Sequence, residues 1–417
     1  MNYEESINKL FALHQFGIKL GLDNIKKLLS HIGNPEQKLR TFHVAGSNGK
    51  GSTASFIASI LTEAEYKIGL YTSPHFVKFN ERIRINGRQI PDSFVVKFMN
   101  ENIDYIENES PTFFELTTAL AFLYFAEECV DYAVIETGLG GRLDATNVLN
   151  SMASVFTSIS FEHTNILGND LISIAKEKAA IIKNNQKVFI GKLPDNAKKI
   201  IVAEGKKNNC EIYDLSCYLE ANDDNEKLIF KNKTIPLDNI PLQGEYQKYN
   251  AALALLTVIS TIPNIGSATA KRGLRNVVQN TGIQGRYEVY NKNPKIIFDA
   301  AHNFEGIEAF LSAFGKEKAK FNKTILIYGA MSDKNVPEIV KMFPKFFDEI
   351  FATEIEYERS LSIKKLITVG KENGVKILPL KYPATYIKSF INQKSNSGKA
   401  LVVLGSIYVL GKIKSGL

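Results

Sequence analysis

Residues 43–53, HVAGSNGKGST, are the stretch that decides how this chain is interpreted. The apolar run 41–45 predicts a β-strand, a glycine-rich turn follows it, and a helix is expected from about Ser52 onward. The glycines let backbone N–H groups turn inward around a phosphate, Lys50 supplies a positive charge, and the helix N-terminus adds its dipole. The stretch therefore predicts a phosphate-binding loop, although Gly51 separates the lysine from Ser52 and departs from the GxxxxGK[ST] pattern. The alternative is a glycine-rich turn before a buried helix.

A second glycine-rich segment follows the predicted strand 132–136, whose last residue is Glu136. In α/β sheets, ligands bind beyond the carboxyl ends of the strands. Glu136 is therefore expected to reach a Mg²⁺ ion held by ATP. The segment does not predict a dinucleotide site, because the pattern GxGxxG counted from Gly138 would need a glycine at Leu143.

Other chemistry-bearing residues lie near the ends of predicted strands. Ser73, His163 and the segment 299–303 each follow such a strand, where an α/β protein builds its site. Each has an alternative interpretation as a turn or a helix cap. Lys178 lies on a predicted amphipathic helix, a position that by itself favours a solvated lysine. Arg286 precedes the expected domain boundary, from which an arginine could reach a phosphate, and the alternative is a surface arginine in a linker.

Short apolar runs alternate with helical stretches along most of the chain, which predicts parallel sheets covered by helices. The predicted strands are 41–45, 67–71, 132–136, 153–159, 187–191, 295–299, 324–329, 349–353, 375–379 and 400–405, and the predicted helices include 52–64, 117–128 and 174–182. The more polar residues 210–241 predict a β-hairpin excursion. The polar segment 290–294 precedes a fresh strand, so two domains are expected, over 1–290 and 291–417.

The composition excludes several classes of protein. Apolar residues make up 44% of the 417 residues, which is enough to bury sizeable cores and excludes intrinsic disorder. The net charge of +7 suits a protein that handles acidic small molecules and is too small to indicate nucleic-acid binding. The three cysteines form no CxxC pair, which argues against a disulfide framework and favours a reducing cytoplasm. The sequence shows neither a signal peptide nor a membrane span, so a cytoplasmic protein is expected.

Taken together, the segments resemble the folylpolyglutamate synthase/dihydrofolate synthase family of Mur-ligase-like, ATP-dependent amide ligases. The resemblance runs from about residue 17 to residue 411 and is most specific over 138–147, GLGGRLDATN. It rests on the segments 45–53, 73–75, 113–115, 136–147, 163–168, 177–181, 247–250, 285–288, 299–303, 333–334 and 405–406. It implies an α/β fold, with an N-terminal P-loop ATPase-like Mur-ligase central domain and a smaller C-terminal Rossmann-like domain for glutamate ligation.

The resemblance also implies roles for individual residues. The residues expected to bind ATP are Ser47, Asn48, Gly49, Lys50, Gly51, Ser52, Asn250, Arg286 and Asp299. Ser73, Glu136, His163 and Lys178 are expected to hold Mg²⁺ at two sites, with Lys178 carbamylated so that it offers an oxygen ligand. The expected substrate-binding residues are Lys19, Leu20, Gly21, Leu22, Thr112, Phe113, Phe114, Glu115, Leu143, Asp144, Ala145 and Ser406. Lys50, Lys178 and His302 are the expected catalytic residues, with His302 a candidate general base.

The reaction implied by the resemblance is the ATP-dependent addition of L-glutamate to dihydropteroate, giving dihydrofolate, and to tetrahydrofolate or its polyglutamates. The acceptor carboxylate would be activated as an acyl phosphate, which the amine of glutamate then attacks. The implied protein is a cytoplasmic monomer that uses ATP and Mg²⁺ and has no nucleic-acid or membrane partner.

Four other functions fit parts of the pattern. A GTPase would normally carry an Asn-Lys-x-Asp segment, which this chain lacks, and a kinase has no evident use for a second α/β domain bearing Asp299. A non-enzymatic nucleotide-binding regulator has no reason to keep Lys178 and His163 together. A Mur-type peptidoglycan ligase is the nearest alternative within the superfamily.

Overall fold

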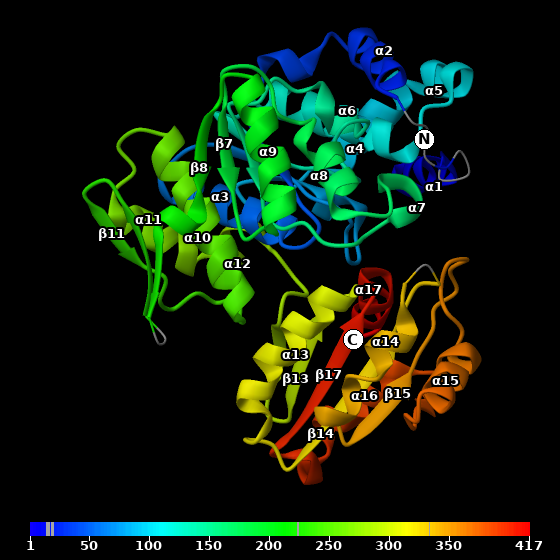
Figure 1. Cartoon of the computed structure of the whole chain (residues 1–417). Helices are drawn as coiled ribbons and strands as arrows, with labels where there is room; N and C mark the ends of the chain where they lie inside the picture. Colours follow the sequence, from blue (N-terminus) through cyan, green and yellow to red (C-terminus); the bar gives the residue numbers. More distant parts are fainter. Residues whose placement is uncertain (14–16, 18–20, 223–224, 333) are drawn as a thin grey trace. The chain divides into compact units, whose positions relative to one another are not determined.

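The computed structural model describes residues 1–13, 17, 21–222, 225–332 and 334–417, and the chain divides into two compact units. The larger unit comprises Met1–Ser73, Phe79–Pro241 and Lys248–Ile283, and the smaller unit comprises Pro74–Lys78, Leu242–Gln247 and Gln284–Leu417. Each unit has its own sheet with helices packed around it (Figure 1). The predicted α/β fold class is thereby confirmed.

The larger unit is built on an eight-stranded sheet with the order β4-β3-β2-β5-β1-β6-β7-β8. Its strands are β1 Thr41–Ala45, β2 Ile68–Tyr71, β3 Ile83–Ile85, β4 Arg88–Gln89, β5 Tyr132–Glu136, β6 Ala153–Phe156, β7 Lys187–Ile190 and β8 Glu211–Asp214. The six strands from β2 to β8 in this order pair in parallel, whereas β3 and β4 form an antiparallel edge. The carboxyl ends of β2, β5, β1 and β6 therefore meet at one edge of the sheet.

Helices cover this sheet. They are α1 Tyr3–Ala12, α2 Asp23–His31, α3 Lys50–Glu63, α4 Asp92–Glu101, α5 Ile103–Glu109, α6 Phe113–Glu127, α7 Thr164–Leu167, α8 Leu171–Ala179, α9 Asp195–Lys207, α10 Glu245–Thr261, α11 Ser267–Arg275 and α12 Val277–Thr281. α6 is apolar on nearly all sides and lies in the core that α1, α2 and α4 complete, as expected for a helix without a polar face. Within the described residues, every helix falls short of the length and apolar character that crossing a membrane would require.

The smaller unit contains a six-stranded sheet with the order β12-β13-β17-β14-β15-β16. Its elements are β12 Glu288–Lys292, β13 Lys295–Asp299, α13 Phe304–Lys318, β14 Lys323–Gly329, α14 Val336–Val340, β15 Glu349–Ala352, α15 Ile363–Glu372, β16 Leu378–Pro379, α16 Pro383–Asn392, β17 Lys399–Gly405 and α17 Ile407–Ser415. Along β13, Ile297 joins one buried cluster while Ile296 and Phe298 join another. Because strand side chains alternate between faces, both faces of this sheet are covered.

Among the sequence predictions about local structure that need correction, one concerns residues 210–241 and another the start of a helix. The stretch 210–241 is not a single hairpin: it begins with β8 of the main sheet and continues as a three-stranded antiparallel sheet, β9 Leu219–Asn222, β10 Asn225–Phe230 and β11 Lys233–Pro236. The helix expected from Ser52 begins at Lys50, because Gly49 takes the N-cap position with a φ of 85°. Lys50 is thus the first residue of α3.

Gly411 in α17 sits against the backbone of the segment Pro74–Lys78, which belongs to the same unit. A Cβ at this position would lie 1.9 Å from the carbonyl oxygen of Phe76. We expect Gly411→Ala to lower the free energy of unfolding by about 1–3 kcal/mol through overpacking. Denaturant unfolding checks this, with Lys412→Ala on the exposed side of the same helix as the control. Equal stability of both variants would contradict the prediction.

Candidate functional site

The glycine-rich turn after β1 forms a loop whose conformation depends on its glycines. Gly46 has a φ of 154°, and a Cβ there would lie 1.9 Å from Thr157 Oγ1. The Lys50 ammonium folds back over this loop and donates to the carbonyl oxygens of Gly46 at 2.9 Å and Ser47 at 3.3 Å. The loop therefore combines a helix N-terminus with a lysine held directly beside it, the arrangement that binds phosphate groups.

Residues after β6 hold this loop in place. Ser47 Oγ donates to the carbonyl oxygen of Ser160 at 3.1 Å and accepts from the Ser160 N–H at 3.0 Å. The Asn48 N–H donates to Ser158 Oγ at 2.9 Å. The loop is thus tied to a neighbouring strand end instead of depending on its own turns.

Asn250 and Ser52 also lie beside the loop. A Cβ on Gly49 would come within 2.5 Å of Asn250 Oδ1, so α10 brings an amide side chain against the turn. Ser52 Oγ is buried and has no hydrogen-bond partner among the described residues. A buried hydroxyl without a partner is costly unless a ligand completes its hydrogen bonding.

Glu136 and Ser73 meet at the same edge of the sheet. Glu136 is the last residue of β5 and is 4% exposed, and Val44 of β1 is its partner in the parallel pairing. Ser73 follows β2, the other neighbour of β5, and its N–H donates to Glu136 Oε2 at 2.9 Å. This contact brings together two of the strand-end residues that the sequence singles out.

Lys178 is buried, with 1% of its side chain exposed, and its ammonium donates to the carbonyl oxygen of Gly46 at 3.0 Å. It also forms an ion pair with Glu162 Oε1 at 2.6 Å. Burial lowers the pKa of Lys178. Burial favours the protonated form of Glu162, but the charges of Lys178 and Lys50 outweigh it and lower the pKa of this carboxyl to about 2. Because Lys178 is buried, its interpretation as a solvated lysine is wrong. Its partner Glu162 directly precedes His163 in the chain.

A second group of predicted residues gathers around the loop that follows β5. A Cβ on Gly138 would lie 2.4 Å from Phe114 Cζ, so this ring packs directly on the loop. Thr112 caps α6 through a reciprocal pair of hydrogen bonds with Glu115, which fixes the segment that carries Phe114. Asp144 accepts from the Leu139 N–H at 2.7 Å and so closes the loop on itself.

The structure describes some of the remaining residues that were predicted to bind substrate, and it brings only part of them together. Phe113 and Ala145 belong to one buried cluster, and the partly buried Leu22 and Phe114 pack against it, so the structure brings these four together. Leu143 is half-buried within the loop, and Gly21 precedes α2 with no neighbour within 4 Å of where its Cβ would be. Lys19 and Leu20 lie outside the described residues.

In the smaller unit, Asp299, His302 and Ser406 share the carboxyl edge of adjacent strands. Asp299 ends β13 and accepts from the N–H groups of Tyr287 at 2.6 Å and Ala301 at 2.8 Å. His302 Nδ1 lies 2.9 Å from the Ala300 carbonyl oxygen, and Ser406 caps α17 directly after β17. Burial raises the pKa of Asp299 to about 6, against the opposing charge of Arg286.

The raised pKa of Asp299 makes stability depend on pH. Because the pKa in the folded state exceeds the usual 3.8, the folded protein binds more protons between about pH 4 and 6, and this group's contribution to the free energy of unfolding falls as pH rises through that window. Asp299→Asn should remove this contribution. Denaturant midpoints of both proteins from about pH 4 to 7 provide the measurement. An unchanged difference between the proteins across that range would contradict it.

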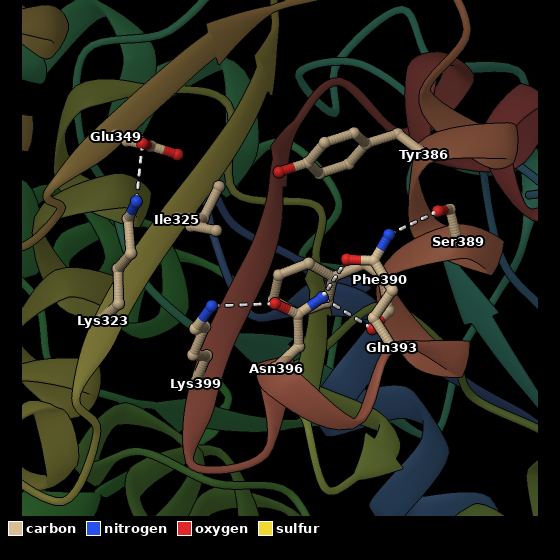
Figure 2. Close-up of a pocket in the computed structure, with 9 residues that line it drawn as sticks. All are labelled: Lys323, Ile325, Glu349, Tyr386, Ser389, Phe390, Gln393, Asn396 and Lys399. Carbon is tan, nitrogen blue, oxygen red and sulfur yellow. Dashed lines mark hydrogen bonds and ion pairs between the residues drawn. The ribbon is translucent and has the colours of Figure 1, made fainter.

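The smaller unit also has a pocket of about 140 Å³ (Figure 2). Lys323, Glu349 and Lys399, which line it, are the first residues of β14, β15 and β17, so it lies at the amino edge of the sheet. Asp299 ends a parallel strand and therefore lies at the opposite edge. Lys323 pairs with Glu349 at 2.6 Å, and Lys399 donates to Asn396 Oδ1 at 2.9 Å. We assign this pocket no part in the site.

Glu162 is the charged residue that sequence reasoning did not select. Its carboxylate is the ion-pair partner of Lys178 and lies within electrostatic reach of Lys50. The feature of the sequence that could have pointed to Glu162 is its position after a predicted strand, directly before His163. Turn acids are common at such positions, so the sequence alone gave no reason to prefer it.

Two family models match successive parts of the chain. Residues 44–258 match the Mur ligase middle domain, and residues 285–407 match the Mur ligase glutamate ligase domain. The first match alone covers more than half of the chain, and the site at the carboxyl edge of the larger sheet lies almost entirely within it.

Relatives that match over the full length of the chain identify its family among the Mur ligases. The dihydrofolate synthase/folylpolyglutamate synthase of Bacillus subtilis (strain 168) is 34% identical, over 100% of this chain and 99% of that protein. Escherichia coli FolC in complex with DHPP and ADP is 26% identical with a TM-score of 0.84, over 100% of this chain and 97% of that one. A bifunctional folylpolyglutamate synthase/dihydrofolate synthase with Mn, AMPPNP and L-glutamate bound is 25% identical with a TM-score of 0.83, over 97% and 96%. The chain therefore belongs to the dihydrofolate synthase/folylpolyglutamate synthase family of Mur ligases.

Proposed function

We propose that this chain is an ATP-dependent ligase that joins L-glutamate to dihydropteroate and to tetrahydrofolate or its polyglutamates. The observation that carries the proposal is the buried Lys178–Glu162 pair, whose ammonium contacts the Gly46 carbonyl of the phosphate loop at 3.0 Å. A phosphate loop alone fits many nucleotide-binding proteins. A buried lysine and carboxylate beside it fit a site that handles several charged groups at once. Membership of the ligase family supports the same reaction.

ATP would be held by the loop after β1 together with residues from both units. The proposed ATP-binding residues are Ser47, Asn48, Gly49, Lys50, Gly51, Ser52 and Asn250 in the larger unit, with Arg286 and Asp299 in the smaller. Lys50 supports this assignment because its ammonium already lies among the loop carbonyls, where it can turn toward a terminal phosphate.

The donor set fits divalent cations. The Glu136 carboxylate is a hard oxygen ligand of the kind Mg²⁺ prefers. The buried Ser52 Oγ, without a partner in the described part of the chain, would find one in a bound phosphate beside the cation. We propose two Mg²⁺ sites, formed from Ser73, Glu136, His163 and Lys178. Among the described residues, no three His, Cys, Asp or Glu side chains form a cluster that could bind a metal by themselves. Metal binding is therefore expected to depend on the nucleotide phosphates and on modification of Lys178, and when bound the metal would offset phosphate charge.

Carbamylation of Lys178 is chemically consistent with its surroundings. The neutral amine attacks CO₂, a carbamate forms and a proton leaves, so burial, which lowers the pKa of Lys178, favours the reactive form. The product would place a second anion beside Glu162, now 2.6 Å from the lysine nitrogen. Two buried anions held side by side repel strongly unless a cation lies between them. Carbamylation and cation binding should therefore occur together.

The reaction divides into two transfers. An oxygen of the acceptor carboxylate attacks the γ-phosphorus of ATP, the bond to the β,γ-bridging oxygen breaks, and ADP leaves. Lys50 would offset the charge on the transferred group. The neutral amine of glutamate then attacks the acyl carbon, the bond to phosphate breaks, and inorganic phosphate leaves with the amide formed.

His302 is the proposed base for the glutamate amine. Its Nδ1 lies 2.9 Å from the Ala300 carbonyl oxygen, so in the neutral ring Nδ1 carries the proton and Nε2 carries the lone pair. That tautomer can accept a proton at Nε2. Ser406, at the adjacent strand end, is proposed to bind substrate beside it.

The acceptor would bind near the loop after β5. The proposed binding residues are Lys19, Leu20, Gly21, Leu22, Thr112, Phe113, Phe114, Glu115, Leu143, Asp144 and Ala145. The packing of Phe114 on Gly138 supports the role of the aromatic segment. We further propose that 1–290 functions as the ATP-binding domain and 291–417 as the glutamate-ligase domain, in a cytoplasmic monomer.

A Mur-type peptidoglycan ligase is the competing function. Mass spectrometry of the products separates the two: the proposal predicts a glutamate adduct of dihydropteroate and of tetrahydrofolate, and none of a UDP-linked sugar peptide. Addition to the sugar peptide alone would contradict it.

A further inference from the structure

A buried histidine that the proposed mechanism does not use lies beneath the loop after β5. His43 is the middle residue of β1 and is 0% exposed. Its Nε2 lies 2.8 Å from Thr146 Oγ1, in the short helical turn Ala145–Val148. The Thr146 hydroxyl in turn donates to Asp144 Oδ1. A chain of three side chains thus runs from the strand that leads into the phosphate loop to a residue proposed to bind the acceptor.

The protons of this chain can be assigned from Asp144 outward. The ionised carboxylate only accepts, so the hydroxyl of Thr146 must donate to it. Thr146 Oγ1 then accepts from the imidazole, which places the ring proton on Nε2. His43 Nδ1 is left as a bare lone pair, and it has no hydrogen-bond partner within the described residues. Burial and the charge of Lys183 lower the pKa of His43 to about 3, so the ring stays neutral.

Asp144 is the residue through which this chain acts on the loop. Its Oδ2 accepts from the Leu139 N–H at 2.7 Å, and its Oδ1 accepts from the Thr146 N–H at 3.0 Å. The carboxylate therefore ties the start of the loop to its end. Rotation of the carboxylate would release both contacts, and the hydroxyl of Thr146 opposes that rotation.

We propose that His43, as the neutral Nε2–H tautomer, is a positioning residue for the acceptor substrate: it orients the Thr146 hydroxyl, which holds Asp144 and the loop that bears it. The inference rests on the proposed function for the identity of the acceptor. It adds to that function, because part of the affinity for the acceptor would come from a side chain that acts through Thr146 and Asp144.

Kinetics of matched variants test the role. His43→Leu should raise the KM for dihydropteroate by about tenfold, the loss of one buried hydrogen bond, while the KM for ATP changes by less than about twofold. His43→Gln, whose amide N–H can reach the same hydroxyl, should restore most of the affinity. Thr146→Val should match His43→Leu, and the double variant should be no worse than either. Thr41→Val is the control, because this buried hydroxyl lies two residues away on the same strand and bonds instead to Ser151 Oγ at 3.0 Å.

A spectroscopic measurement on the wild-type protein tests the tautomer of His43 without requiring turnover. In ¹⁵N-labelled wild-type protein, the ring signal that disappears in His43→Gln should report a neutral Nε2–H tautomer between about pH 5 and 8. An Nδ1–H tautomer, a protonated ring, or an equal rise of both KM values in His43→Leu would overturn the role. Absence of wild-type turnover would instead contradict the proposed function, and the tautomer, read without substrate, would still decide the polarity of the network.

Discussion

Replacing Lys178 by alanine is expected to reduce glutamate-dependent ADP release by at least about 100-fold while ATP binding survives. The side chain is buried and lies between the Gly46 carbonyl and Glu162, but the phosphate loop itself is held by contacts that do not involve it. Its loss should therefore spare the nucleotide and remove the proposed carbamate ligand. Steady-state turnover together with calorimetric titration of a non-hydrolysable ATP analogue separates the two effects.

The same substitution leaves Glu162 without its ion-pair partner, which costs about 3–5 kcal/mol for a buried pair. Loss of activity through unfolding must therefore be distinguished from loss of chemistry. The double variant Lys178→Ala/Glu162→Gln removes the unpaired charge and should recover stability but not turnover. Lys176→Ala, an exposed lysine on the same helix, is the matched control and should behave as the wild type. Near-normal turnover of Lys178→Ala would exclude the carbamate role.

Lys50→Met is expected to reduce turnover with both acceptors by about 10²–10³-fold. The Lys50 ammonium donates to Gly46 O at 2.9 Å and to Ser47 O at 3.3 Å, and Lys178 also donates to Gly46 O, at 3.0 Å. Methionine keeps the length of the side chain and its packing, so the loop should retain its shape. The expected fall in turnover therefore reflects the removal of the positive charge.

The readout for this variant is single-turnover formation of ADP at saturating nucleotide. A fall in rate that saturating ATP cannot restore places the charge in the transfer step, as proposed. A fall that ATP fully restores would mean that Lys50 only binds the ground state, and would contradict its assignment as a catalytic residue.

The sequence predicts strands well where an apolar run has a sharp end. The strands 41–45, 132–136 and 295–299 agree with β1, β5 and β13 to the residue, because a glycine-rich turn, a carboxylate or a proline bounds each of them. The run 153–159 is predicted too long, since only Ala153–Phe156 is β6. Beyond it, the Thr157 hydroxyl donates to the Asn48 carbonyl oxygen of the phosphate loop. Such tertiary contacts cannot be read from periodicity.

In the candidate site too, the sequence predicts some features, while contacts between distant residues cannot be predicted from it. Motifs at strand ends singled out Ser73 and Glu136 separately, and the structure brings them into contact because parallel strands end at the same edge of the sheet. The partnership of Lys178 with Glu162 joins residues 16 positions apart through a turn and a helix, for which the sequence offers no spacing rule. The hydrogen bond between His43 and Thr146 joins residues 103 positions apart, and a histidine inside an apolar strand gives no sign of which loop will cover it.

Glutamate-dependent release of ADP, measured in parallel with dihydropteroate and with tetrahydrofolate under Mg²⁺ and bicarbonate, tests the central claim most directly. The account predicts turnover with both acceptors, and none when glutamate or the acceptor is omitted. Turnover with tetrahydrofolate alone would remove the dihydrofolate synthase half of the proposal. Turnover with neither acceptor would contradict the account.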